Sequence, residues 1–182
     1  MAVPVLISAF GPKGPAIAHE IADGWMGVSP PAESFDWAVQ MVNGTVLAPG
    51  EAPSAPRVID DVGAWMVGAY HMTWEQNPEG LSAIPGGADW LAQIESERPE
   101  EERHLAVHQS HCTHLNTADR KAIAAFGDAV PWHGWVGVAE DVRKRAEEAA
   151  AAGTTEILYT PAGDNMLGQA ETFIRAVESV QG

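Results

Sequence analysis

The chain has 182 residues, with 25 acidic residues against 10 basic ones and a formal net charge of −15. This balance argues against nucleic acid and anionic membrane surfaces as partners, because both are bound by clustered lysine and arginine. No apolar run approaches the roughly 18 residues of a spanning helix, no signal peptide is visible, and a single cysteine excludes an internal disulfide. The sequence therefore predicts one domain over residues 1–182 in a reduced, cytoplasmic setting.

The first segments predict a strand, a helix and a second strand. Residues 3–10, "VPVLISAF", form a short apolar run bounded by Gly-Pro, which indicates a strand buried on both faces. Residues 15–24 predict a short helix with Ile17 and Ile21 on its buried side. The apolar residues 25–28, "WMGV", follow as a second strand.

The middle of the chain is predicted to be mostly helical. Apolar residues at helical spacing predict helices over 32–47, 60–76 and 88–103, although the aromatic residues of 60–76 would also suit a strand. Residues 104–115, "HLAVHQSHCTHL", are predicted to form a strand.

The last third predicts a helix, a strand and a final helix. The Ala-rich segment 139–153 starts with acidic residues and ends on glycine, as stable helices do. Residues 155–163 predict a strand that runs into a Pro-Gly loop, and 166–180 predict the last helix. The order is close to four βα units and indicates an α/β fold with a parallel sheet.

The loop "GPKG" is a candidate anion site, since it joins the first strand to the first helix. A helix N-terminus offers free N–H groups and a favourable dipole to a phosphate, and Lys13 adds a positive charge. Gly11 and Gly14 permit close approach of the backbone. The loop matches neither a Walker loop nor GxGxxG, so a tight turn with an exposed lysine is the alternative reading.

Histidines crowd into the predicted strand 104–115. Strand alternation would place four side chains on one face and His111 on the other. The spacing matches no standard zinc pattern, so no metal site is predicted, and pocket-lining or partly exposed histidines are expected instead. His71 lies in a predicted helix and is read as a packed or surface residue. The four residues of the common face are His104, His108, Cys112 and His114.

Two aromatic residues stand where strands end in this scheme. Tyr159 closes a strand, and Trp25 lies near the end of another. Side chains at the carboxyl ends of parallel strands line ligand sites in α/β folds. Contact with a planar ligand and ordinary packing are both open for these residues.

The stretches "VPVLISAFGPKGPAIAHEIADGWMG" and "GWVGVAEDVRKRAEEAAAAGTTEILYTPAGD" resemble the luciferase-like flavin-dependent monooxygenases and oxidoreductases. The first resembles the middle of that family's chain, and the second resembles its closing βα unit. The two stretches occur in the family's order and at its separation. Together they cover about a third of the chain well and most of the rest loosely.

The resemblance implies a TIM-type barrel that binds FMN or the related deazaflavin coenzyme at the carboxyl ends of its strands. It implies that Gly11, Pro12 and Lys13 hold the cofactor's phosphate. It makes Trp25 and Tyr159 candidates for contact with the cofactor ring. The chemistry implied is hydride transfer, or reaction of reduced flavin with oxygen, on a small-molecule substrate.

The chain departs from the family because it starts where the fifth barrel strand is expected. The first four βα units are absent, so the resemblance maps no catalytic residue onto this chain. His108 and His111 are the candidates for contact with substrate. A half-barrel leaves its first and last strands, 3–10 and 155–160, with unpaired edges that invite another chain.

Three functions remain open. One is a flavin- or deazaflavin-dependent oxidoreductase completed by homo-oligomerisation or by a separate N-terminal half. Another is a non-catalytic half-barrel, either a fragment or a partner subunit. The third is a small metal-dependent hydrolase that uses the histidine cluster. A natural half-barrel and a truncated gene would give the same sequence.

Overall fold

A computed structural model describes residues 3–8 and 13–178, and it has an α/β architecture with parallel strands. The strands are β1 (Leu6–Ser8), β2 (Gly24–Gly27), β3 (Ala38–Val42), β4 (Gly44–Val46), β5 (Trp135–Gly137) and β6 (Glu156–Tyr159). The α-helices are α1 (Gly14–Ile21), α2 (Pro56–Met66), α3 (Gly68–Gln76), α4 (Gly87–Glu97), α5 (Arg103–Val107), α6 (Thr117–Ala124), α7 (Ala139–Ala151) and α8 (Met166–Glu178). Two 3-10 helices, η1 (Pro78–Ala83) and η2 (Glu100–Glu102), flank α4.

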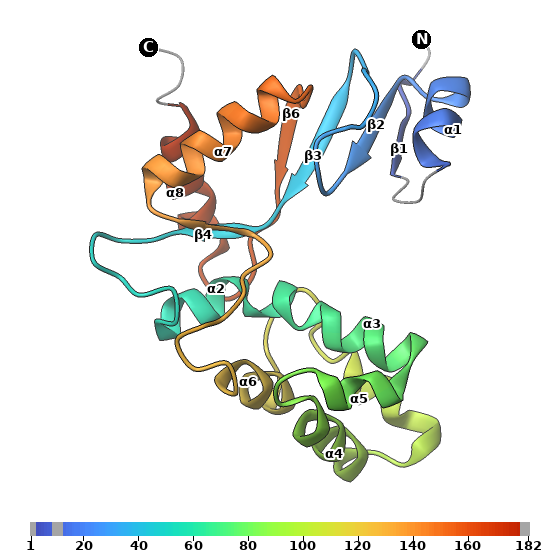
Figure 1. The fold of residues 1–182 in the computed structure, drawn as a ribbon, viewed down its shortest axis with the longest axis vertical. Helices are drawn as coiled ribbons and strands as arrows, with labels where there is room; N and C mark the ends of the chain where they lie inside the picture. The colour runs from blue at the N-terminus through green and yellow to red at the C-terminus, as the bar shows by residue number, and fades with distance from the viewer. Residues whose placement is uncertain (1–2, 9–12, 179–182) are drawn as a thin grey trace.

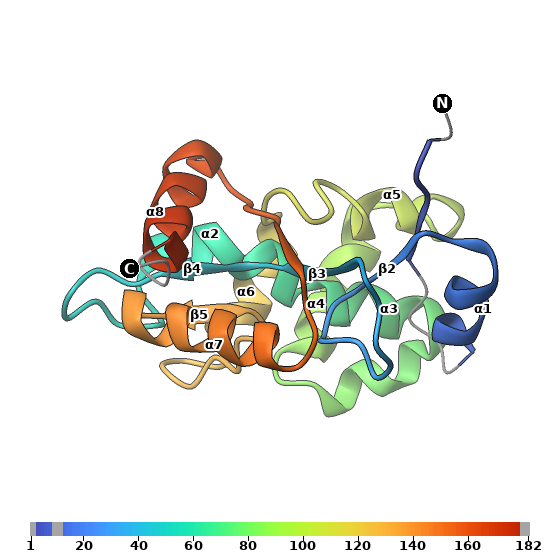
Figure 2. The same ribbon diagram turned by 90° about the horizontal axis from the view of Figure 1, so that it is seen from above.

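The main sheet has four strands in the order β1-β2-β3-β6, and every neighbouring pair is parallel. β4 and β5 form a separate parallel pair. Among the described residues, β1 and β6 each have one strand partner, so the expectation that the first and last strands lie at open edges is confirmed. Figures 1 and 2 show α1 at the β1 end of the sheet and α7 and α8 at the β6 end.

The segment from α2 to α6 forms a helical part inserted between β4 and β5. Figure 1 shows α3 to α6 gathered at the end of the molecule opposite the main sheet. This part has its own hydrophobic core, built around fully buried side chains such as Tyr70, Trp90 and Ile123. A second core lies between β3, α7 and α8 and contains Val42 and Phe173.

Several predicted elements are present. The helix predicted over 15–24 is α1, and its Pro15 lies in the first turn, where a missing N–H costs nothing. The helices predicted over 139–153 and 166–180 are α7 and α8. The strand predicted over 155–163 contains β6, and helices rather than a strand form in 60–76.

Two predicted elements are wrong. Residues 32–47 form β3 and β4 instead of a helix. β3 lies between β2 and β6 and is almost wholly buried, so residues on both of its faces are buried. Val39 and Val42 are both buried for this reason, and their spacing also fits one face of a helix. Residues 104–115 contain most of α5 and a series of turns instead of a strand, because Ala106 and Val107 are drawn into the helical core.

The burial predicted for the N-terminal unit is also wrong. β1 is half-buried to exposed because it lies at the edge of the sheet. In α1, Ala18 is buried, whereas Ile17 and Ile21 are 46% and 65% exposed. The unit therefore presents apolar side chains to the outside. Within the described ranges 3–8 and 13–178, no helix is long and apolar enough to cross a membrane.

Candidate functional site

The predicted phosphate loop is described only from Lys13 onward, and Gly11 and Pro12 lie outside the described residues. Lys13 directly precedes α1 and its side chain is exposed. The first turn of α1 contains no acidic residue, so the helix N-terminus and the lysine together give a positive potential. The described part of the loop therefore fits an anion.

Trp25 lies inside the sheet region and is 6% exposed. Its ring stacks on Phe35 with a centroid distance of 6.1 Å. The indole Nε1 is buried and has no hydrogen-bond partner within the described residues. Trp25 is thus a core side chain whose indole donor is not satisfied by residues 3–8 and 13–178.

Tyr159 ends β6, and both its ring and its hydroxyl group are engaged inside the chain. The hydroxyl donates to the carbonyl oxygen of Gly44 at 2.7 Å, and the ring stacks on Phe173 at a centroid distance of 4.1 Å. Burial raises the pKa of Tyr159, so the hydroxyl stays protonated at neutral pH. These contacts correspond to strand-end packing.

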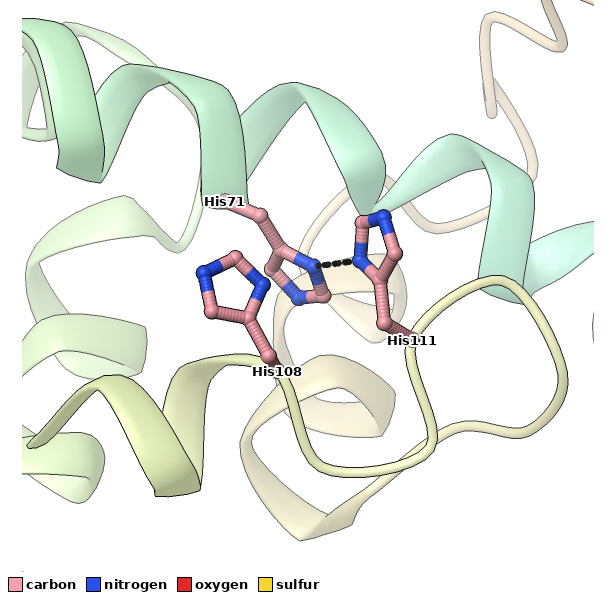
Figure 3. A group of neighbouring side chains, drawn as sticks. All are labelled: His71, His108 and His111. Carbon is pink, nitrogen blue, oxygen red and sulfur yellow. Dashed lines mark hydrogen bonds between the residues drawn. The ribbon is translucent and has the colours of Figure 1, made fainter.

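Three histidines from separate segments converge in the helical part. His71 comes from α3, His108 directly follows α5, and His111 lies in the turn beyond it, as Figure 3 shows. One ring nitrogen from each residue lies within 4.8 Å of the other two. Nδ1 of His71 and Nδ1 of His111 are 2.7 Å apart and share a hydrogen bond. His71 is buried, while His111 faces solvent.

The predicted grouping of the other residues does not form. The face expected to carry His104, His108, Cys112 and His114 does not exist, because the segment is not a strand. His114 instead lies 3.0 Å from Asp164 in the loop after β6. Among the described residues, no hydrogen bond or ring contact joins His108 or His111 to Lys13, Trp25 or Tyr159.

Two carboxylates support the three imidazoles. Oδ1 of Asp119 lies 3.5 Å from Nε2 of His71 and accepts a hydrogen bond from Nε1 of Trp90 at 2.9 Å. Asp119 is wholly buried at the start of α6, where it forms a capping box with Asn116. Oε1 of Glu75 lies 2.9 Å from Nε2 of His108.

The histidine turn is tied to the carboxyl end of the main sheet. The backbone N–H of Gly163, in the loop after β6, donates to the carbonyl oxygen of Thr113 at 2.7 Å. His114 and Asp164 add a side-chain contact between the same two segments. The histidines therefore lie beside the loop that follows β6, the region where parallel α/β sheets bind ligands.

Burial, and to a smaller extent the neighbouring imidazoles of His71 and His108, lower the pKa of His111, because burial removes water from the charged form of the ring. The ring of His111 is accordingly neutral at physiological pH. Neutral imidazoles carry a free lone pair, which can accept a proton or bind a metal ion.

A second polar cluster joins β4, α2 and α8 beside a pocket of about 390 Å³. Asp61 accepts hydrogen bonds from Thr45 at 3.0 Å, Arg57 at 2.5 Å and Gln169 at 2.9 Å. Arg57 also pairs with Glu51, and this pairing lowers the pKa of Glu51 to about 2. Because Asp61 is satisfied by side chains from β4, α2 and α8, the cluster serves chiefly to hold three elements together, although Oε1 of Gln169 is buried without a partner among the described residues.

Sequence reasoning missed His71 as a member of the histidine group, and it missed both supporting carboxylates. Nothing in their spacing links His71, Glu75 and Asp119 to His108 and His111. The one sequence signal was the crowding of histidines after residue 103. Comparison with known proteins adds no relative, since no family model, curated protein or solved structure matches the chain.

Proposed function

We propose that this chain is a half-barrel subunit of a flavin- or deazaflavin-dependent oxidoreductase of the luciferase-like class. The observation that carries the proposal is the main sheet, in which four strands lie in chain order, all parallel, with both edges open. A TIM-type barrel is a parallel sheet closed on itself, with a helix after each strand. This chain departs from the expected series of βα units, because β2 is followed directly by β3 and β3 by β4, without a helix between them. A second copy of the chain, or a separate N-terminal half, would supply the missing strands.

The exposed apolar side chains beside the edges support completion by another chain. On the β1 side Val3 is 82% exposed, and Val5, Ile17 and Ile21 are also exposed. On the β6 side Leu158 and Ile174 are exposed. Open edges that carry apolar side chains favour pairing with a further strand.

The phosphate of the cofactor would be held by the loop of Gly11, Pro12 and Lys13 at the N-terminus of α1. The exposed Lys13 and the acid-free first turn of α1 support this role. Bound FMN or deazaflavin would supply hydride-transfer chemistry, and the residues of this chain would bind and orient it. Trp25 fits a supporting role behind the site, since its ring is buried and its indole N–H has no acceptor in the part of the chain that the structure describes.

The substrate would be a small molecule bound near the loop after β6. His108 and His111 are the proposed contacts, because their turn is hydrogen-bonded to that loop through Thr113 and Gly163. Imidazole side chains at this position can donate a proton to a substrate or accept one from it.

The test combines native mass with cofactor binding. Light scattering on the purified chain is followed by fluorescence titration with FMN and with the deazaflavin coenzyme. We expect an oligomer that binds one of them at micromolar affinity or better, with binding weakened about tenfold or more in Lys13→Ala. Lys144→Ala, an exposed lysine on α7, is the matched control and is expected to bind as the unaltered chain does.

An oligomer that binds neither cofactor would overturn the enzymatic proposal for the chain by itself. The chain would then be a non-catalytic half-barrel, and affinity for a separately produced N-terminal half would be measured next. Equal binding by Lys13→Ala and Lys144→Ala would reject the phosphate loop while leaving the barrel itself in place.

A further inference from the structure

We propose that His71, His108 and His111 form a site for one divalent transition-metal ion, preferentially Zn²⁺, with three imidazole ligands and an open fourth position. The site lies in the helical part and needs neither a flavin nor a second chain. Two of its ligands, His108 and His111, are also the proposed substrate contacts, so a bound ion would lie at the proposed substrate site, but metal binding can be tested without flavin.

The spacing of the three rings is close to what a tetrahedral ion requires. Zinc binds imidazole nitrogen at about 2.0–2.1 Å, which puts neighbouring ligand nitrogens roughly 3.3 Å apart. The nitrogens here lie within 4.8 Å of one another, and the closest pair is 2.7 Å apart. Separation of His71 from His111 by about half an ångström, with a small approach of His108, would create the ligand geometry.

In His71 and in His108, a carboxylate faces one ring nitrogen, and the other ring nitrogen is available to coordinate the ion. Nε2 of His108 is occupied by Glu75, so its Nδ1 is free to coordinate. Nε2 of His71 faces Asp119, so its Nδ1, which points toward His111, is the coordinating atom. A carboxylate behind a histidine is the usual outer partner of a metal ligand, since it fixes the tautomer and the orientation of the ring.

The outer nitrogen of His71, on the side of the ring that faces Asp119, is weakly held. The side chain is 2% exposed, yet its Nε2 has no hydrogen bond within the described residues and has only the long contact with Asp119. A cation on Nδ1 would make the Nε2–H more acidic and shorten that contact. Asp119 is held by Trp90 and by the start of α6, so the carboxylate is already in position.

The charges and the access route also suit a cation. Glu75 and Asp119 together carry two negative charges, which offset those of a divalent ion. His111 is exposed and His108 is half-buried, so an ion can reach the site from solvent without opening the core. Three histidines and a free position form the ligand pattern of zinc sites that activate water or bind a substrate group.

The backbone around His111 is arranged to turn this side chain toward α3. Ser110 and Cys112, on either side of it, both have φ of +59°, a conformation that residues other than glycine seldom adopt. Strained backbone of this kind concentrates at functional sites, where it fixes the direction of a side chain. The competing explanation is a hydrogen-bonded histidine trio that only packs the helical part.

The experiment titrates ZnCl₂ into the untagged, chelator-treated full chain by isothermal calorimetry. We expect one ion per chain at micromolar or tighter affinity, and a Co²⁺ complex with the absorption bands of tetrahedral coordination. His108→Ala and His111→Ala should weaken Zn²⁺ binding at least tenfold, and Glu75→Gln by a smaller factor. His104→Ala is the matched control, since it removes an exposed histidine from α5 itself, and it should change affinity less than about twofold.

Affinity weaker than about 100 µM, or binding by His111→Ala equal to that of His104→Ala, would overturn the site. Circular dichroism checks that each variant is folded. If the histidine variants unfold, zinc-edge X-ray absorption of the unaltered chain decides, because fewer than three imidazole ligands would refute the proposal. A chain that binds Zn²⁺ but no flavin would leave this site standing and reject the proposed function.

Discussion

Replacing Asp119 by alanine is predicted to destabilise the helical part by about 2–4 kcal/mol. One carboxylate oxygen accepts from Trp90 and the other from the backbone N–H of Asn116, and the residue is 0% exposed. The N-cap bond from the backbone N–H of residue 119 to Asn116 remains, and loss of the reciprocal bond from the N–H of Asn116 to the carboxylate costs about 1 kcal/mol. The buried indole N–H left without an acceptor costs about 1–3 kcal/mol more.

Urea unfolding followed by far-UV circular dichroism measures this loss, and two further variants sharpen it. Asp119→Asn keeps one oxygen and can accept from only one of the two donors. Its free energy of unfolding should therefore lie between that of Asp119→Ala and that of the unaltered chain. Asp89→Ala removes an exposed acid from the first turn of α4 and should cost about half a kcal/mol. A loss below about 1 kcal/mol in Asp119→Ala, or one no larger than in Asp89→Ala, would refute the reasoning.

The remaining predictions concern acid stability and assembly. The pKa of Glu51 is held at about 2, below its ordinary 4.5, chiefly by Arg57, so the stabilisation is complete above pH 4.5 and is lost as the pH falls toward 2. Because Arg57 is 43% exposed, solvent screening reduces the effect to about 1 kcal/mol. In urea unfolding, the free energy of unfolding of Glu51→Gln should therefore be lower than that of the unaltered chain at pH 7, and the difference should be smaller at pH 3. An equal difference at the two pH values would contradict this prediction. Val5→Lys places a charge at the 49% exposed edge beside β1 and should lower the native mass in light scattering, whereas an unchanged oligomer would exclude this edge as the interface.

Local sequence patterns were sufficient to predict those helices and strands whose formation depends mainly on their own residues. α7 is rich in alanine and acidic at its start, and α8 carries a clear apolar stripe, so both helices form where the pattern predicts. β6 could also be predicted, because it is a short apolar run that precedes a loop with proline and glycine.

The failures occur where neighbours in space decide the structure. β3 has buried residues on both of its faces, which only its central position between β2 and β6 explains. α5 forms because Ala106 and Val107 meet a core built by distant helices. A single sequence contains neither piece of information.

The candidate site residues also fall into those that a local sequence pattern indicates and those that only tertiary contacts bring together. Lys13 stays a prediction, which rests on a local signal, a lysine at a strand-to-helix turn. The grouping of His71 with His108 and His111 depends on how α3 packs against the turn after α5. The sequence did not predict Asp119 as a partner of His71, because its local role in the capping box of α6 already explains an acidic residue at this position.

The two hydrophobic cores imply that the chain contains two cooperative units. The described side chains of the helical core come from residues 59 to 132, whereas the sheet core joins residues as distant as 42 and 176. Amide hydrogen exchange in the sheet should therefore slow when a partner covers the open edges, while exchange in the helical unit stays the same. Evolution can accordingly change what completes the sheet without disturbing the histidines.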